Sequence, residues 1–118
     1  MSMNKFINIA KAIALVFTFA FVTTSANANE ILGKWKTESG ETALITNCGS
    51  SICIVLKTGD YKGQSIGKLK VDGNKYKGSV RDPADDKTYT GSIVVTGNSL
   101  KMQGCIAIFC KTQKWTRM

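Results

Sequence analysis

The chain of 118 residues carries 16 basic and 8 acidic residues and no histidine, which gives it a formal net charge of +8. The lack of histidine excludes the most common general base and the most common metal ligand. The length allows one small domain, which buries only about 60 to 65% of its unfolded surface. Such a marginal core is commonly reinforced by disulfides in exported proteins.

Residues 1–28 are predicted to form a secretory signal peptide. Lys5 and Lys11 supply a basic start, residues 12–22 form an uncharged apolar run, and residues 26–28 read Ala-Asn-Ala, a small-x-small cleavage site. The apolar run is shorter than the roughly 20 residues that a transmembrane helix needs. An uncleaved membrane anchor is therefore the weaker alternative.

The mature protein is expected to be a single domain, residues 29–118, with a net charge of about +6 once the two lysines of the signal are removed. We expect a monomer without a transmembrane segment, located in the periplasm or outside the cell. The basic pI of about 9.5 is compatible with nucleic-acid binding. We do not expect that partner, because the lysines are dispersed along the chain and export separates the protein from it.

Short runs rich in Val, Ile, Thr and Tyr, broken every eight to twelve residues by Gly, Asn or Asp, predict an all-β domain. Tight hairpin turns are expected at Asp72-Gly73-Asn74 and at Thr96-Gly97-Asn98. Because short hairpins link all neighbouring strands, the prediction is a small eight-stranded antiparallel up-and-down barrel, closed on itself and stapled by disulfides. The expected strands are residues 31–37, 41–48, 52–57, 66–72, 75–81, 87–96, 99–105 and 110–117.

A further turn is expected at residues 82–86, which contain the only proline of the chain, Pro83. Asp82 is interpreted as an Asx-type turn residue, and Asp85-Asp86 as a solvated loop. Within the strands, residues of one parity are expected to face inward and the lysines of the other parity outward. The inward set is Leu69, Val71, Tyr76, Val80, Ile93, Val95, Leu100 and Met102.

All four cysteines lie in two echoed stretches, CGSSIC at residues 48–53 and CIAIFC at residues 105–110. With Ser50-Ser51 as a two-residue loop, Cys48 faces Cys53 where the strands approach most closely, a geometry that suits a disulfide. The same register, with Ala107-Ile108 as the loop, sets Cys105 opposite Cys110. Both pairs can therefore close locally.

Four cysteines permit three connectivities. A long link such as Cys48 to Cys105 would stabilise the fold by about 4.2 kcal/mol in the chain-entropy model, against about 2.2 kcal/mol for a local link. Hairpin geometry and fast local closure nevertheless favour 48–53 and 105–110. A four-cysteine zinc site and a redox-active pair fit less well, given the oxidising compartment and the spacing. We expect neither metal nor cofactor.

The first predicted strand carries Gly33-x-Trp35 and the last carries Trp115-x-Arg117. These strands are neighbours in a closed barrel, so Trp35 and Trp115 can stack across the seam while Arg117 covers an indole face. Two core tryptophans and a surface arginine are the alternative. The arrangement resembles the lipocalin-like (calycin) barrels, in which a Gly-x-Trp near the start packs against an arginine from the end.

A wider set of motifs runs along the chain: Gly33-x-Trp35, Asn47-Cys48-Gly49 with Cys53, Asp82-Pro83-x-x-x-Lys87-Thr88-Tyr89, Gly104-Cys105 and Thr112-Gln113-x-Trp115-x-Arg117. In this order, the motifs resemble those of a bacterial exported family known as domain of unknown function 2147. The resemblance implies a lipocalin-like barrel, an envelope location and no established activity. Between Lys57 and Gly67 this chain is shorter than the longer family members, which argues against a deep ligand mouth.

An enzyme is the less favoured interpretation, because the acidic residues do not form a recognisable catalytic set. General acid-base work would depend on carboxylates that lie mostly in predicted turns, and no nucleophile, metal cluster or phosphate-binding loop accompanies them. We therefore expect no catalysis. The carboxylates considered are Glu38, Glu41, Asp60, Asp82, Asp85 and Asp86.

The leading hypothesis is a non-catalytic binding module for a small apolar ligand or an envelope component, with Tyr76, Tyr89 and Met102 as candidate ligand-lining residues. The alternative is an interaction protein acting through its surface, such as a secreted protease inhibitor or an envelope-associated factor, with a barrel filled by side chains. Lysines spaced two apart would then make weak contact with an anionic surface. These are Lys34/Lys36, Lys68/Lys70 and Lys75/Lys77.

Overall fold

The computed structural model describes residues 28–118. The predicted signal peptide lies outside this described part, apart from Ala28. The described chain begins with a short helix, α2 (Ala28–Ile31), where the first strand was expected to begin at residue 31. Within residues 28–118, no helix is long and apolar enough to cross a membrane.

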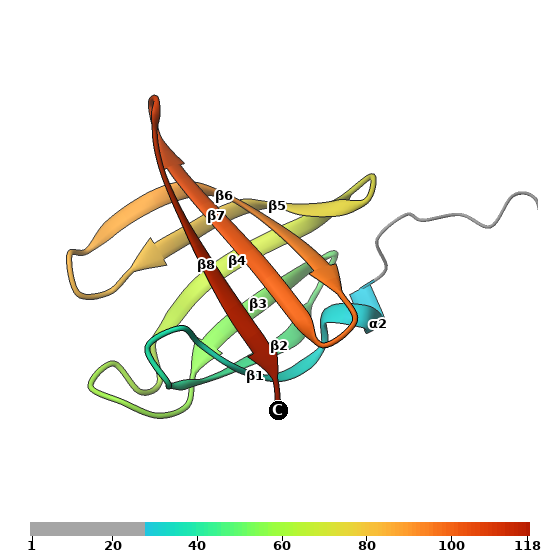
Figure 1. Ribbon diagram of the computed structural model, residues 1–118, viewed down its shortest axis with the longest axis horizontal. Coiled ribbons are helices and arrows are strands. Elements are labelled where there is room, and N and C mark those ends of the chain that lie inside the picture. The colour runs from blue at the N-terminus through green and yellow to red at the C-terminus, as the bar shows by residue number, and fades with distance from the viewer. Residues whose placement is uncertain (1–27) are drawn as a thin grey trace, which may run out of the picture.

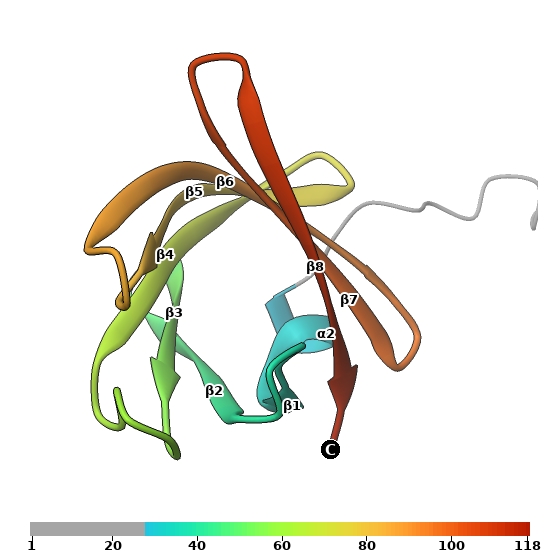
Figure 2. The ribbon, with the colours of Figure 1, turned by 60° about the vertical axis from the view of Figure 1, so that its left-hand side comes forward.

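Eight antiparallel strands follow in chain order and close into a barrel, β8 returning to pair with β1. Figures 1 and 2 show them wound around one interior. The predicted eight-stranded antiparallel up-and-down barrel is therefore confirmed. The strands are β1 (Gly33–Lys36), β2 (Thr42–Cys48), β3 (Ser51–Leu56), β4 (Ser65–Asp72), β5 (Lys75–Asp82), β6 (Lys87–Thr96), β7 (Ser99–Ile106) and β8 (Phe109–Arg117).

The barrel wall is uneven at its seam. β1 meets β8 at only two residue pairs, Trp35↔Arg117 and Lys36↔Thr116. β7 and β8 pair along their whole length, from Ser99↔Thr116 to Ile106↔Phe109. Their hairpin therefore extends beyond the barrel body, as Figure 1 shows, and every residue from Phe109 to Lys114 is exposed.

Alternation along the strands builds the core largely as predicted. Six of the eight residues expected to face inward are buried, and Val95 is partly buried. Val71 is the exception at 46% exposure. The ladder between β3 and β4 ends at Ile52↔Leu69, so no strand flanks Val71 on that side.

Both disulfides are local. Cys48 is joined to Cys53 with their Cα atoms 5.8 Å apart, and Cys105 is joined to Cys110 with their Cα atoms 4.0 Å apart. All four cysteines are thus bonded.

The two hairpins differ in register. Cys105 lies opposite Cys110 as predicted, whereas the prediction for the first hairpin is wrong by one position: Cys48 lies opposite Ser51, and the loop is Gly49-Ser50. Gly49 has a φ of +73°, which glycine adopts without steric cost. The turn therefore forms at the glycine, and the disulfide crosses the ladder diagonally.

Candidate ligand pocket at the open end of the barrel

One end of the barrel is closed by α2, which is held by two residues of the seam. The indole Nε1 of Trp35 donates a hydrogen bond to the carbonyl of Ile31 at 2.9 Å. The Arg117 guanidinium lies 4.2 Å from the Trp35 ring centroid and donates to the carbonyls of Glu30 and Gly97. Figure 1 shows α2 beside the turn between β6 and β7.

At this seam, Arg117 lies opposite Trp35 and covers its indole. The cation over an indole face that the sequence predicts is present. Trp115 is also buried, but it lies two residues further from the closed end and lines the pocket described next. Its Nε1 donates to the Gln113 side chain at 2.9 Å.

The opposite end holds a half-open pocket of about 280 Å³. The strands and their connections on this side, β1–β2, β3–β4, β5–β6 and β7–β8, all contribute to it. Its lining is Thr37, Ser39, Glu41, Leu56, Tyr61, Ile66, Val80, Arg81, Asp82, Pro83, Ala84, Tyr89, Met102, Gly104, Lys111, Gln113 and Trp115.

The interior of the pocket is apolar and partly aromatic. Val80, Tyr89, Met102 and Trp115 are all buried side chains that line it. Gly104 lies between two of them: a Cβ placed there would be 3.0 Å from the Tyr89 Cβ and 3.3 Å from a Val80 methyl group. The missing side chain therefore lets Tyr89 pack closely against the wall.

Arg81 and its partners form one side of the rim. Its Nη2 lies 2.8 Å from Asp86 Oδ1, and its Nη1 donates to Gln64 at 2.9 Å. Asp86 was expected to be only a solvated loop residue, but the hairpin turn brings it back to Arg81, and it has a φ of 55°. Since the Asp86 side chain is 79% exposed, solvent limits the ion pair to about 1 kcal/mol or less.

The carboxylates at the rim are engaged in local hydrogen bonds. Asp82 accepts a hydrogen bond from the Ala84 amide at 3.0 Å, the Asx-turn contact expected from the sequence. Glu41 accepts one from the Ser39 hydroxyl at 3.0 Å, while its own amide donates to Thr37. These contacts shape the loops around the mouth.

Lys111 supplies a cation that these carboxylates do not neutralise. Its Nζ lies 5.7 Å from the Tyr89 ring centroid, and neither salt bridge formed within residues 28–118 involves it. Lys111 shares the parity of Trp115 along β8 and lies opposite Gly104 on β7. The pocket therefore combines an apolar interior with one cation available at its mouth.

Only two of the three candidate ligand-lining residues line the pocket. Tyr89 and Met102 line the pocket, whereas Tyr76 is 1% exposed and belongs to the core outside the lining. Of the turn motif, Asp82 and Pro83 are at the rim and Lys87 is exposed opposite Asp82.

Arg81 and Lys111 were not predicted from the sequence to line a pocket, and Gly104 was noted there only as part of a family motif. The parity of Lys111 with Trp115 was an available signal for one of them. Gly33 lies at the start of β1 near the closed end.

The lysine doublets lie along the outer wall, with Lys70 directly opposite Lys77. Lys77 is also 3.6 Å from Asp72, and both side chains are more than half exposed.

Residues 56–117, just over half of the chain, match a family model described as "Uncharacterized protein conserved in bacteria (DUF2147)". The match begins at the last residue of β3, so it includes the Asp82-Pro83 turn, Gly104-Cys105 and Trp115-x-Arg117 but not Gly33-x-Trp35 or Cys48. No curated protein and no solved structure matches the chain. On the extent of the family match, this β-barrel with two disulfides belongs to that family of uncharacterised bacterial proteins.

Proposed function

We propose that the protein is a non-catalytic, lipocalin-like binding module that holds a small amphipathic ligand at the open end of its barrel. The observation that carries the proposal is the half-open pocket of about 280 Å³, with its apolar interior and the cation of Lys111 at its mouth. Ligand pockets usually measure about 300 to 1,000 Å³. Because this pocket is slightly smaller than that range, it favours a small ligand.

Apolar contact is expected to supply most of the affinity. Each 100 Å² of apolar ligand surface removed from water contributes roughly 2.5 kcal/mol. An ion pair with the exposed Lys111 contributes about 1 kcal/mol or less. Lys111 therefore orients the ligand, with an anionic group at the mouth and an apolar body against Val80, Met102 and Trp115.

The test is a binding titration of the purified, disulfide-bonded protein with octanoate, decanoate and dodecanoate, monitored by calorimetry and by native mass spectrometry. We expect affinity to rise with chain length until the pocket is full. Lys111→Met should weaken binding about threefold to fivefold, the equivalent of a partly screened ion pair. The matched control is Lys114→Met on the same strand, whose side chain has the opposite parity and faces away from the pocket.

A second variant tests the apolar interior. Met102→Trp should fill part of the pocket and reduce binding of every carboxylate, while thermal unfolding reports whether the barrel still folds. The proposal fails if none of the three carboxylates binds, or if Lys111→Met and Lys114→Met bind them equally.

The two disulfides of a bacterial protein suggest an oxidising location outside the cytoplasm. We propose further that residues 1–28 direct export and are removed, and that the protein works as a monomer in the periplasm or outside the cell. Cell fractionation with N-terminal sequencing tests export and cleavage. A mature protein beginning far from residue 29, or one retained in the cytoplasm, would contradict it.

A further inference from the structure

The tip of the β7–β8 hairpin exposes large apolar side chains. Ile106, Ile108 and Phe109 are 42%, 87% and 74% exposed. They make up half of the large exposed apolar residues within residues 28–118, although they lie within four consecutive positions. Figures 1 and 2 show that this tip is the part of the hairpin that projects farthest from the barrel.

This tip is an ordered part of the fold, held by strand pairing and a disulfide. The ladder continues to Ile106↔Phe109, and the Cys105–Cys110 disulfide closes it directly behind these residues. Ala107 completes the two-residue turn at a φ of 55°. The apolar side chains are thus presented on a constrained hairpin, so little conformational entropy is lost when they dock.

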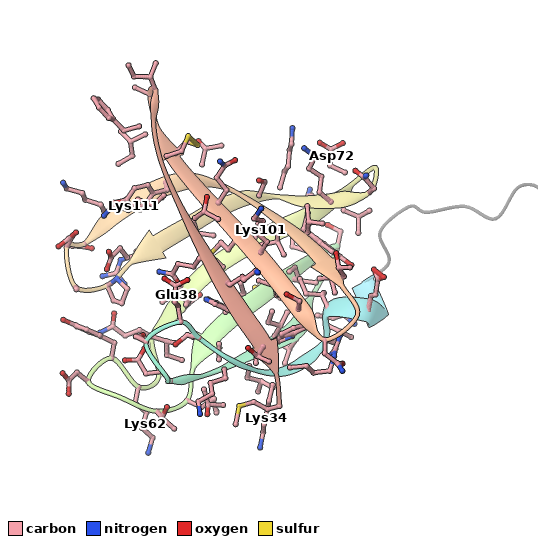
Figure 3. All side chains as sticks on the ribbon, viewed as in Figure 1. Lys34, Glu38, Lys62, Asp72, Lys101 and Lys111 are labelled. Atoms are coloured by element: carbon pink, nitrogen blue, oxygen red, sulfur yellow. A yellow bond between two sulfur atoms is a disulfide. The ribbon has the colours of Figure 1, made fainter. Side chains whose placement is uncertain are left out.

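The charged residues on the two hairpin strands, β7 and β8, are all basic. Residues 87–118 contain five basic residues and no acidic residue. Lys101, Lys111 and Lys114 lie on the two strands of the hairpin itself, and Figure 3 shows Lys111 and Lys101 behind the tip, toward the barrel. An apolar tip followed by lysines matches the order of layers at a bilayer surface, where acyl chains lie beneath anionic headgroups.

We propose that this hairpin tip, residues 105–110, inserts into an anionic lipid surface, with the hairpin lysines against the headgroups. The size of the tip favours a bilayer over a protein partner. A stable protein interface buries about 800 Å² on each side and about 20 to 30 residues, far more than three side chains at the end of a hairpin offer. Insertion into lipid needs only the apolar tip and the nearby positive charge.

Docking in this way would place the pocket at the membrane surface. Ile106 and Phe109 continue, by strand alternation, the face of the hairpin that carries Gly104 and Lys111 in the pocket lining. An amphipathic molecule would then meet an apolar surface between the bilayer and the pocket. This consequence rests on the proposed binding function, whereas the docking itself does not.

The test is cosedimentation of the mature, disulfide-bonded protein with vesicles of phosphatidylcholine alone and of phosphatidylcholine mixed with phosphatidylglycerol. We expect binding to the mixed vesicles that weakens as salt is added. Ile108→Ser combined with Phe109→Ser should reduce this binding at least tenfold. Val94→Ser is the matched control, since Val94 is 39% exposed on the barrel wall and should leave binding unchanged.

A direct readout comes from Phe109→Trp, whose emission should shift to shorter wavelength when mixed vesicles are added. Lys101→Gln combined with Lys114→Gln should reduce binding about tenfold and flatten its salt dependence, because each lysine near an anionic surface contributes about as much as a weak ion pair. These two lysines face away from the pocket, so decanoate binding should not change.

Equal vesicle binding by the wild type and the Ile108→Ser/Phe109→Ser variant would overturn the proposal. So would a wild type that forms dimers without lipid, if the same variant were monomeric by analytical ultracentrifugation, because the occupant would then be a second copy. Decanoate titration of this variant in solution separates the two hypotheses. Lost vesicle binding of the variant with normal decanoate binding supports the docking tip, whereas a wild type that binds mixed vesicles but no decanoate contradicts only the pocket.

Discussion

The two cysteine hairpins have the same spacing and a disulfide each, yet they lie in opposite surroundings. The β2–β3 hairpin forms part of the barrel wall, and Ser51 and Ile52, just after its turn, are 6% and 2% exposed. The tip of the β7–β8 hairpin lies outside the wall, and its residues between the cysteines are exposed. The disulfide therefore sets the local closure, whereas the neighbouring strands decide whether the enclosed residues become core or surface.

The largest expected difference lies between Ile52 and Ile108, which occupy these two hairpins. Ile52→Ala should lower the free energy of unfolding by 2 to 5 kcal/mol, roughly the cost of a cavity in a packed core. Ile108→Ala should change it by about 0.5 kcal/mol or less, because the side chain is already in solvent. Urea unfolding followed by tryptophan fluorescence measures both. Similar losses for the two variants would mean that the β7–β8 tip is packed in solution.

Removal of each disulfide gives the next largest difference. Both links close loops of equal length, worth about 2.2 kcal/mol in the chain-entropy model. Cys48→Ala with Cys53→Ala should lose about that amount of unfolding free energy. Cys105→Ala with Cys110→Ala should lose about 1 kcal/mol or less, because the projecting tip can open without unfolding the barrel.

Hydrogen exchange provides the control for the disulfide comparison. Loss of the Cys105–Cys110 link should accelerate exchange at the tip amides and leave that of the barrel strands unchanged. Equal losses of global stability from the two double variants would show that the tip unfolds together with the barrel.

The smallest expected effects concern the turn residues with positive φ. Gly49→Ala should cost about 1 kcal/mol of unfolding free energy, since nothing crowds the added methyl and only the backbone conformation is strained. Ala107→Gly should relieve the same strain, with a gain below about 1 kcal/mol. Thermal unfolding at matched protein concentrations measures both the loss of stability in Gly49→Ala and the gain in Ala107→Gly. A destabilised Ala107→Gly variant would indicate that the Ala107 methyl makes a contact that offsets its strain.

Much of the architecture follows from local sequence. Period-2 alternation and regular Gly, Asn and Asp punctuation act over a few residues, so they predict strands, turns and inward faces well. Asp82 behaves as an Asx-turn residue because its partner is only two positions away. Cys105 and Cys110 face each other because their loop admits no competing turn residue as permissive as glycine.

The sequence predictions are wrong where the register or burial of a residue depends on a neighbouring strand or on a competing turn residue. Gly49 moved the first cysteine hairpin by one position, because its positive φ was easier to adopt than that of a serine. Val71 has the correct parity but lies beyond the end of the β3–β4 ladder. Tyr76 and Tyr89 both have inward parity, and only their height along the barrel separates core from pocket.

An antiparallel all-β barrel and two hairpins able to close local disulfides follow from the sequence, since alternation, turn chemistry and loop length are short-range properties. The tertiary structure alone decided that one end is closed by α2 and the other holds a pocket. It also decided that Arg81 meets Asp86 and that Lys111 faces the mouth. The physical reason is that barrel closure aligns residues from eight strands in three dimensions, and their relative heights depend on the registers of all strands together.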